Sequence, residues 1–491
     1  MIFLYSSDGH RFTFDEDVAN QEALRISTMK PDSSFKSGES RLFFEYPYLF
    51  PPETNTRPLC MSGILCSASN IGHSLTESIF VFLNHNFKIL QNVNIFENDD
   101  FNDSTYVYWR NNLNPDFVFL ELAYGPIFSS LSVGTFFLIS RIFNLNLKTS
   151  VILSFFYAFS TLTWAYSQTS LNSVSMTFFL LLGVLFFIKF IKNDKKLDLV
   201  LSSSSLSFAF LIRPDTILAI IPLFGFLLLT LKNRNTKIQK LTSFTIPLIF
   251  VYVINRLLYE IRFDVKTSIL SGLPADYPTA IHTGILGLLF SPGVGLFIFA
   301  PILLTVFVSF PDFYKKEKKF CFLFVVIVIS FLIFYGRLQD WHGLVSWGPR
   351  YLLPIIPFLL IPLGFTLEKR KNNILKIIIV LLVVTGVFFN LVYIIQDVQW
   401  FIWGTMGQEK GLYTLGRMSN GNVYPLWINP VVLYTFEYSQ LTHSIIWSLA
   451  NLHTDIFLLE LLGYQIYTIS FVSMVCVPIY LLLKQIKSKP R

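Results

Sequence analysis

Long apolar runs separated by short polar connections dominate the sequence. Eleven of these runs approach the roughly 20 residues that a helix needs to cross the hydrocarbon core of a bilayer. They cover residues 117–140, 150–167, 170–188, 197–212, 214–231, 241–259, 284–310, 320–336, 351–367, 374–396 and 457–483. The fourth run is the least apolar because it holds a serine cluster, Ser202 to Ser205. The pattern predicts an all-α polytopic membrane protein with about 11 transmembrane helices.

Positive charge in alternate connections between the runs indicates how the helices are oriented. Lys and Arg are retained on the cytoplasmic side of a membrane. Six connections hold 22 of the 38 basic residues and only five acids; they are residues 141–148, 189–198, 232–240, 312–319, 368–376 and 484–491. These connections carry a net charge of +17, against −10 for the rest of the chain. The signal predicts a cytoplasmic C-terminus and an extracytoplasmic location for residues 1–116, 260–283, 337–350 and 397–456.

Composition agrees with a membrane location and excludes other classes of protein. Hydrophobic residues make up 53% of the 491 residues, charged residues make up 14%, and the mean hydropathy is +0.55. Since soluble domains carry about 25% charged residues, this chain cannot cover a globule of its size with polar side chains. The low charge also excludes a disordered chain and a nucleic-acid-binding module. The formal charge of +7 is therefore an orientation signal and indicates no acidic partner.

The predicted topology divides the chain into four regions. Residues 1–116 form a large first extracytoplasmic loop with amphipathic helices, and residues 117–396 form the transmembrane core with short outer loops. Residues 397–456 form a second extracytoplasmic region, and residues 457–491 form the last transmembrane helix and a cytoplasmic tail. A tail as long as the first region crosses a membrane only behind a signal, and apolar residues 1–5 are too short to be one. We therefore expect a twelfth span upstream; the alternative is that the true first span lies elsewhere in the chain.

The first candidate for chemistry is an acidic cluster that includes Asp15 and Glu16. Ala19 and Ala23 recur at helical spacing just after it, so the acids lie before or on the first turn of an amphipathic helix. The helix dipole favours acids at this position, which explains them as capping residues. At a membrane surface the same carboxylates are suited to act as a general base on a hydroxyl. The local pattern leaves both interpretations open.

The densest group of polar and aromatic side chains lies in the short outer loop between the runs 320–336 and 351–367. It consists of Arg337, Asp340, Trp341, His342, Trp347, Arg350 and Tyr351, with further small and polar residues between them. Tryptophans often anchor membrane interfaces and arginines snorkel to them, which accounts for single residues but not for the whole group. Arg and His donors beside aromatic rings suit a phosphate and a sugar, so the loop is a candidate binding site.

Three further motifs lie at the outer ends of the apolar runs. Arg213 occupies a short turn in which it is placed to bind a phosphate, although the Pro and Asp that follow it are also ordinary capping residues. Glu121 and Tyr124 lie at the start of the first run and face either a cavity or the membrane interface. The Pro and Gly residues of segment 291–295 break helical hydrogen bonding. Either the exposed backbone groups face protein or a polar cavity, or the segment is only a kink in the helix.

Taken together and in this order, the motifs resemble those of the GT-C class of integral-membrane glycosyltransferases. The similarity is greatest to the branch that includes protein O-mannosyltransferases and the lipid A aminoarabinose transferase. Asp15 and Glu16 before an amphipathic helix look like that branch's acidic motif in the first outer loop. Residues 124–126, 213–215, 291–293 and 347–354 look like short segments found in many prokaryotic members. The resemblance covers residues 8–360 as scattered motifs.

The resemblance implies a transferase that moves a hexose or mannose-like sugar from a polyprenyl-phosphate donor to a hydroxyl of a protein, lipid or glycan acceptor. Asp15 takes the role of the base, with Glu16 beside it. Binding of the donor phosphate and sugar falls to Arg213, Arg337, Asp340, His342, Trp347, Arg350 and Tyr351. No metal is required where arginines neutralise the phosphate, although Asp15, Glu16 and Asp17 are able to bind a divalent cation. The sequence departs from the family at Val294, a position that is often basic, and in showing no span before Asp15.

Two other functions use similar features. A flippase or transporter of a lipid-linked sugar needs the phosphate-binding arginines but no base, and it needs binding groups near the middle of the membrane, where few charges lie. A polymerase or ligase of surface polysaccharide also has many spans and a large outer loop, but here the largest loop precedes the spans. We therefore predict a glycosyltransferase in the cell membrane, with the lipid donor, the acceptor and membrane lipids as its partners.

Overall fold

The fold is described by a computed structural model for residues 2–7, 14–28, 70–90, 115–231, 234–263, 279–338, 341–343, 346–369, 373–395, 413–414, 427–428 and 430–450. The first elements are α1 (Ile2–Tyr5), α2 (Phe14–Thr28) and α4 (Ile71–Phe87). The core follows with α6 (Pro115–Ile142), α7 (Leu147–Phe159), α8 (Thr163–Tyr166), α9 (Asn172–Asn193), α10 (Lys196–Ile212), the 3-10 helix η3 (Pro214–Thr216), α11 (Ile217–Thr230) and α12 (Arg234–Phe263). It continues with α13 (Ile281–Phe290), α14 (Leu296–Phe299), η4 (Pro301–Thr305), α15 (Val306–Lys316), α16 (Lys318–Gly336), η5 (Arg350–Ile355), α17 (Ile356–Lys369) and α18 (Asn373–Ile395). The last described helices are α20 (Pro430–Tyr434) and α21 (Gln440–Ala450).

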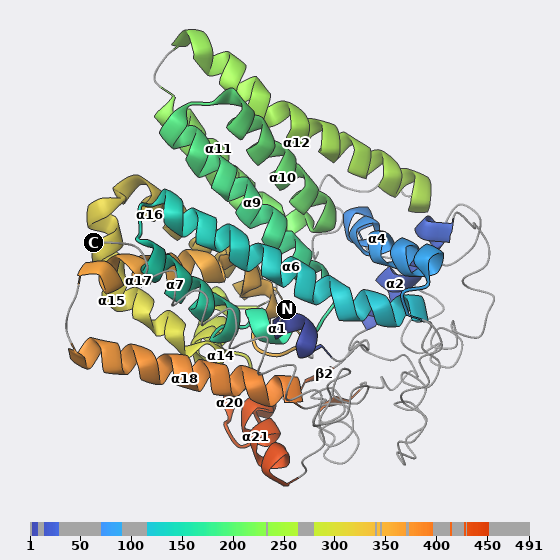
Figure 1. Cartoon of the computed structure of the whole chain (residues 1–491), viewed down its shortest axis with the longest axis vertical. Helices are drawn as coiled ribbons and strands as arrows, with labels where there is room; N and C mark the ends of the chain where they lie inside the picture. The colour runs from blue at the N-terminus through green and yellow to red at the C-terminus, as the bar shows by residue number, and fades with distance from the viewer. Residues whose placement is uncertain are drawn as a thin grey trace, which may run out of the picture.

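Six helices in this part of the chain are long and apolar enough to cross a membrane. They are Pro115–Ile142, Asn172–Asn193, Lys237–Leu258, Lys318–Gly336, Arg350–Lys369 and Asn373–Ile395. Helix α12, which lies at the edge of the bundle in Figure 1, shows the surface they present: Ile246, Ile249 and Phe250 are 62%, 58% and 63% exposed. A continuous apolar surface of this kind suits lipid and not water. The helices therefore indicate a membrane-embedded, helical protein.

Phenylalanine fills much of the space between the helices. The ring of Phe143, just after α6, lies 5.8, 5.4 and 6.1 Å from the rings of Phe313, Phe320 and Phe324, measured between centroids. Phe365 of α17 lies 6.2 Å away. Edge-to-face pairs at such distances stabilise a core beyond the burial of their area. One aromatic cluster thus joins α6, α15, α16 and α17 at one end of the bundle.

Most of the predicted apolar runs are helical. The six long helices coincide with the runs 117–140, 170–188, 241–259, 320–336, 351–367 and 374–396. The runs 197–212 and 214–231 form α10, with 17 residues, and η3 followed by α11. The run 457–483 lies outside the described residues, so the total of eleven spans stays a prediction.

Two predicted runs are not continuous helices. In the run 284–310, α13 ends at Phe290, the chain turns through residues 291–295, and short helices lead into α15. Pro292 and Pro301 lack the amide proton that a continuous helix requires, and the glycines between them favour turns. In the run 150–167, α7 ends at Phe159 and only the short α8 follows. Hydropathy continues across both breaks, whereas backbone hydrogen bonding does not.

Five of the six basic connections that we assigned to the cytoplasmic side contact one another at one end of the bundle; the sixth, residues 484–491, lies outside the described residues. Four contacts between different connections have nitrogen–oxygen distances of 2.5 to 3.2 Å: Lys192 with Glu317, Lys240 with Asp194, Lys369 with Asp312, and the Asn146 amide with Glu368. These five connections therefore fall into one spatial group, as alternating orientation predicts. Which side of the membrane this group faces stays a prediction.

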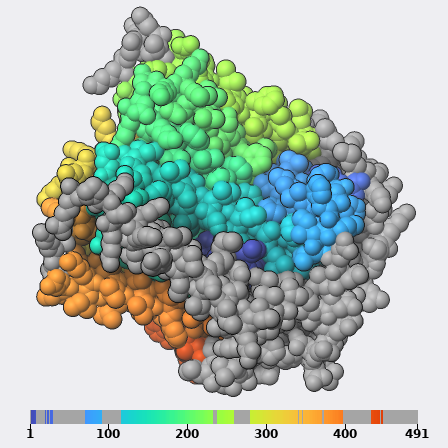
Figure 2. All heavy atoms as spheres, viewed as in Figure 1, coloured from blue at the N-terminus to red at the C-terminus, as the bar shows by residue number. Residues whose placement is uncertain are grey.

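The described parts of the predicted outer segments lie at the other ends of the same helices. Helix α2 packs on α4, and α4 packs on α6 near the start of that long helix (Figure 1). In the space-filling view α4 forms a bulge beside α6 (Figure 2). The one departure from an all-α fold in the described residues is a pair of two-residue antiparallel strands, β1 (Tyr413–Thr414) and β2 (Trp427–Ile428). It belongs to the predicted outer region 397–456.

Candidate functional site

Arg213 lies at the centre of a buried polar cluster between α10, α9 and α16. Proline follows it, which disfavours a helical conformation, so α10 ends at Ile212 and Arg213 is extended, with φ −146° and ψ 118°. Its guanidinium donates to the Asn172 side-chain oxygen at 3.3 Å, to the Tyr335 hydroxyl at 2.8 Å and to Asp215 Oδ1 at 3.2 Å. The Tyr335 hydroxyl also donates to Asp215. Arg213 is thus held in one orientation by three different elements.

An aromatic platform joins Arg213 to Arg350 of the predicted outer loop. The rings of Tyr335 and Tyr351 are stacked, 4.5 Å apart and 6° from parallel. The guanidinium carbons of Arg213 and Arg350 lie 5.6 and 5.2 Å from the centroid of the Tyr351 ring, within the range of a cation–π interaction. We call Arg213, Asp215, Tyr335, Arg350 and Tyr351 the arginine cluster. It brings together three of the predicted donor-binding residues from positions up to 138 apart in sequence.

His342 lies beside this cluster and is almost fully buried, with 9% of its surface exposed. Burial, and then the nearby Arg350 charge, lower the pKa of His342 from 6.5 to about 4. His342 is therefore neutral at pH 7, and it can offer a phosphate a hydrogen bond but no charge. Gly343 follows with a φ of +75°, and a Cβ there would lie 3.1 Å from Arg350 Cγ. A glycine at this position lets the turn and the Arg350 side chain approach each other.

The other predicted residues of the loop have different surroundings. Trp347 is buried, and its ring packs against Phe299 and Tyr393, each with a centroid distance of 5.0 Å. Arg337 is exposed just after α16. Asp340 lies outside the described residues. Their roles in donor binding stay predictions.

The predicted acidic motif begins helix α2. Asp15 and Glu16 lie on its first turn, as the spacing predicts, and the positions of their side chains lie outside the described part of the structure. Ala19 and Ala23 are fully buried, so the predicted apolar face is the packed face. Capping and catalysis both stay predictions for these two acids.

Two residues that flank the acidic motif bind Glu121 of α6. On one side, the Ser7 hydroxyl donates to the backbone oxygen of Glu121 at 3.5 Å. On the other side, the Asn20 side-chain amide donates to Glu121 Oε1 at 2.6 Å. The segment that carries Asp15 is thus attached to Glu121 both before and after the motif.

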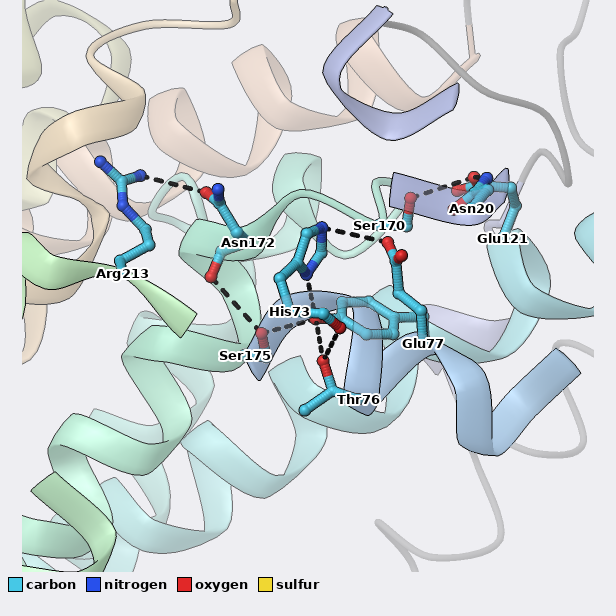
Figure 3. Close-up of polar contacts among 10 residues, drawn as sticks. Asn20, His73, Thr76, Glu77, Glu121, Ser170, Asn172, Ser175 and Arg213 are labelled. Atoms are coloured by element: carbon cyan, nitrogen blue, oxygen red, sulfur yellow. Dashed lines mark hydrogen bonds and ion pairs between the residues drawn. The ribbon is translucent and has the colours of Figure 1, made fainter. Parts of the chain in front are cut away.

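Glu121 is in turn joined to the arginine cluster through the start of α9 (Figure 3). The Ser170 hydroxyl donates to Glu121 Oε1 at 3.0 Å, and Asn172, two residues later, accepts from Arg213. The first outer segment and the arginine cluster are therefore bound to the same short stretch of chain.

A second buried network connects α4 to this stretch. His73 Nε2 lies 3.0 Å from Glu77 Oε1, and His73 Nδ1 lies 3.1 Å from the Tyr124 hydroxyl. That hydroxyl donates to Ser175 of α9 at 2.5 Å and is 3.0 Å from Thr76 (Figure 3). The sequence prediction included Tyr124 but omitted His73 and Glu77, although their spacing of four residues places both on one face of a helix.

The region 397–456 reaches the site through α20. The backbone oxygen of Leu433 accepts from the Gly293 amide at 3.1 Å and from the Ser291 hydroxyl. Tyr434 lies 6.3 Å from the ring of Trp341. The turn at residues 291–295 is therefore packed against protein, which satisfies its non-helical backbone.

Among the described residues, no group of three His, Cys, Asp or Glu side chains is arranged to hold a metal ion. The side chains of Asp15 and Glu16 are not part of that set. Comparison with models of known protein families and with curated proteins gives no match for this chain.

Proposed function

We propose that the protein is a membrane glycosyltransferase that uses a polyprenyl-phosphate sugar and glycosylates an acceptor hydroxyl on the extracytoplasmic side. One observation supports this proposal most strongly. Ser7 and Asn20, which flank the acidic motif, both bind Glu121, and Glu121 is linked through Ser170 to the segment that binds Arg213. Such a transfer needs a base and phosphate-binding cations, and these contacts link the two segments to which we assign them.

The arginine cluster supplies the phosphate-binding part of the proposal. Arg213 is already paired with Asp215, so it adds little net charge; its main contribution is to hold Tyr335, whose ring stacks on Tyr351 beside Arg350. The Arg350 guanidinium also lies over the Tyr351 ring. Gly343, which has no side chain, leaves room for the Arg350 side chain beside the turn. We assign the direct contact with the donor phosphate to Arg350, and a hydrogen bond from neutral His342 to the phosphate or the sugar.

In the proposed reaction Asp15 accepts the proton of the acceptor hydroxyl. The acceptor oxygen attacks the anomeric carbon from the side opposite the phosphate, so the new carbon–oxygen bond forms as the bond to the phosphate oxygen breaks. The leaving polyprenyl phosphate keeps the electron pair, and Arg350 stabilises its charge. A single displacement of this kind inverts the configuration of the sugar.

Membrane vesicles that contain the protein and a radiolabelled polyprenyl-phosphate sugar test the proposal. We expect covalent transfer of label to an acceptor by the wild type and its loss in Asp15→Asn. Movement of intact labelled lipid across the membrane without a covalent product would indicate a transporter instead. Equal transfer by both proteins would remove Asp15 from the mechanism.

A further inference from the structure

We propose that Glu121 is a positioning residue, which holds the helix that bears Asp15 against the segment bound to Arg213. The inference rests on the proposed function for its kinetic consequences, and its structural part is independent of that function. It assigns a role to a carboxylate inside a predicted transmembrane helix, where an ionisable group is costly without a specific purpose.

Glu121 is almost completely buried, with 1% of its surface exposed. Its Oε1 accepts two hydrogen bonds, from the Asn20 amide at 2.6 Å and from the Ser170 hydroxyl at 3.0 Å. These donors come from α2 and from the loop before α9, so a single oxygen atom joins two segments 150 residues apart. Two hydrogen bonds to Oε1 offset part of the cost of burying the polar side chain.

The position of Asn20 on α2 transmits this contact to the acidic motif. Asp15 precedes Asn20 by five residues, and a helix rises about 1.5 Å per residue, so the two lie about 7.5 Å apart along the axis. Ala19 and Ala23, on either side of Asn20, are buried without large side chains that could hold the helix by interlocking. The polar contact with Glu121 is therefore well suited to set the register of α2.

The other end of the link is equally short. Ser170 and Asn172 are separated by one residue, and Asn172 accepts a hydrogen bond from Arg213 at 3.3 Å. Movement of α2 relative to Glu121 would thus change the distance from Asp15 to the phosphate-binding cations. A displacement of about 1 Å of a reacting group is able to cost about 100-fold in rate.

Three variants separate a positioning role from other roles. Glu121→Leu removes the acceptor, Glu121→Gln keeps an Oε1 that can accept both hydrogen bonds, and Asn20→Leu removes the donor on α2. Asp116→Asn is the matched control, since Asp116 is another buried acid of α6 but binds Asn84 and His85 of the α4 region.

The first measurement is hydrogen–deuterium exchange of the full-length protein in detergent micelles, without substrate. We expect faster exchange of the amides of α2 in Glu121→Leu and Asn20→Leu, with exchange of α9 unchanged. Glu121→Gln and Asp116→Asn keep the wild-type protection of α2. Unchanged protection of α2 in both leucine variants would overturn the proposal, whatever reaction the protein catalyses.

The second measurement is steady-state transfer of labelled sugar. We expect kcat to fall about 100-fold in Glu121→Leu, with KM for the lipid donor within about threefold of the wild type, because the arginine cluster is intact. Glu121→Gln retains most of kcat. Equal loss in the Gln and Leu variants would assign the effect to the charge of Glu121 and overturn the positioning role. Absence of transfer by the wild type would contradict the proposed function and leave the exchange result to decide the structural claim.

Discussion

The pair of Arg213 and Asp215 allows a quantitative test of the arginine cluster. The two side chains are 14% and 6% exposed, and Arg213 Nη2 lies 2.9 Å from Asp215 Oδ2. Arg213→Gln removes the cation but leaves the carboxylate in its buried place. Removal of one partner of a buried pair costs about 3–5 kcal/mol, because the remaining charge is not compensated.

The double variant Arg213→Gln with Asp215→Asn separates this cost from a simple loss of packing. It removes both charges and leaves two amides that can hydrogen-bond to each other, so we expect it to recover at least half of the lost stability. Unfolding by sodium dodecyl sulfate in mixed micelles, followed by tryptophan fluorescence, measures the free energy of unfolding of each protein. The single variant Asp215→Asn completes the comparison. If the double variant is destabilised as much as Arg213→Gln, or by the sum of the two single variants, the interpretation of Arg213 and Asp215 as a buried ion pair is refuted.

Two further changes test the surroundings of the cluster. The pKa of His342 is about 4 in the folded state and about 6.5 in the unfolded state. Between pH 6.5 and pH 4 the unfolded state therefore binds more protons than the folded state, and the free energy of unfolding decreases as the pH falls through this range. We expect the wild type to lose about 3 kcal/mol more than His342→Gln between pH 7 and pH 4, measured by the same unfolding assay; an equal loss would contradict the burial of His342. Gly284 allows α13 to approach α16, since a Cβ there would lie 1.9 Å from the backbone oxygen of Gly336. Gly284→Leu should therefore separate the helices and destabilise the protein by more than about 2 kcal/mol, whereas Gly134→Leu, at a position with open space, should not.

The sequence predicted those features that depend on local pattern. Helical spacing of Ala19 and Ala23 located α2 and its buried face, and apolar length located the six long helices. Alternating basic connections predicted a group that the structure brings together through Lys192, Lys240 and Lys369. Each of these signals is carried by neighbouring residues, so no tertiary contact is needed to detect it.

Features that depend on contacts between distant segments were missed. A tyrosine at the end of an apolar run is typical of a membrane interface, and nothing near Tyr335 in sequence indicates that its ring stacks on Tyr351. The close approach of Gly284 to Gly336 is equally non-local. Hydropathy also predicted one continuous helix over residues 284–310, although the helix breaks at residues 291–295. Hydropathy does not measure the loss of helical hydrogen bonds at Pro292.

The most direct test of the central claim is transfer of radiolabelled sugar from a polyprenyl-phosphate donor by purified protein in proteoliposomes, with wild type and Asp15→Asn compared at equal donor occupancy. We predict a covalent labelled product with the wild type and at least a 100-fold lower rate with Asp15→Asn, while donor binding is retained. Transfer by Asp15→Asn at the wild-type rate would contradict the proposed mechanism. Passage of the labelled lipid across the bilayer without any covalent product would contradict the assignment as a transferase.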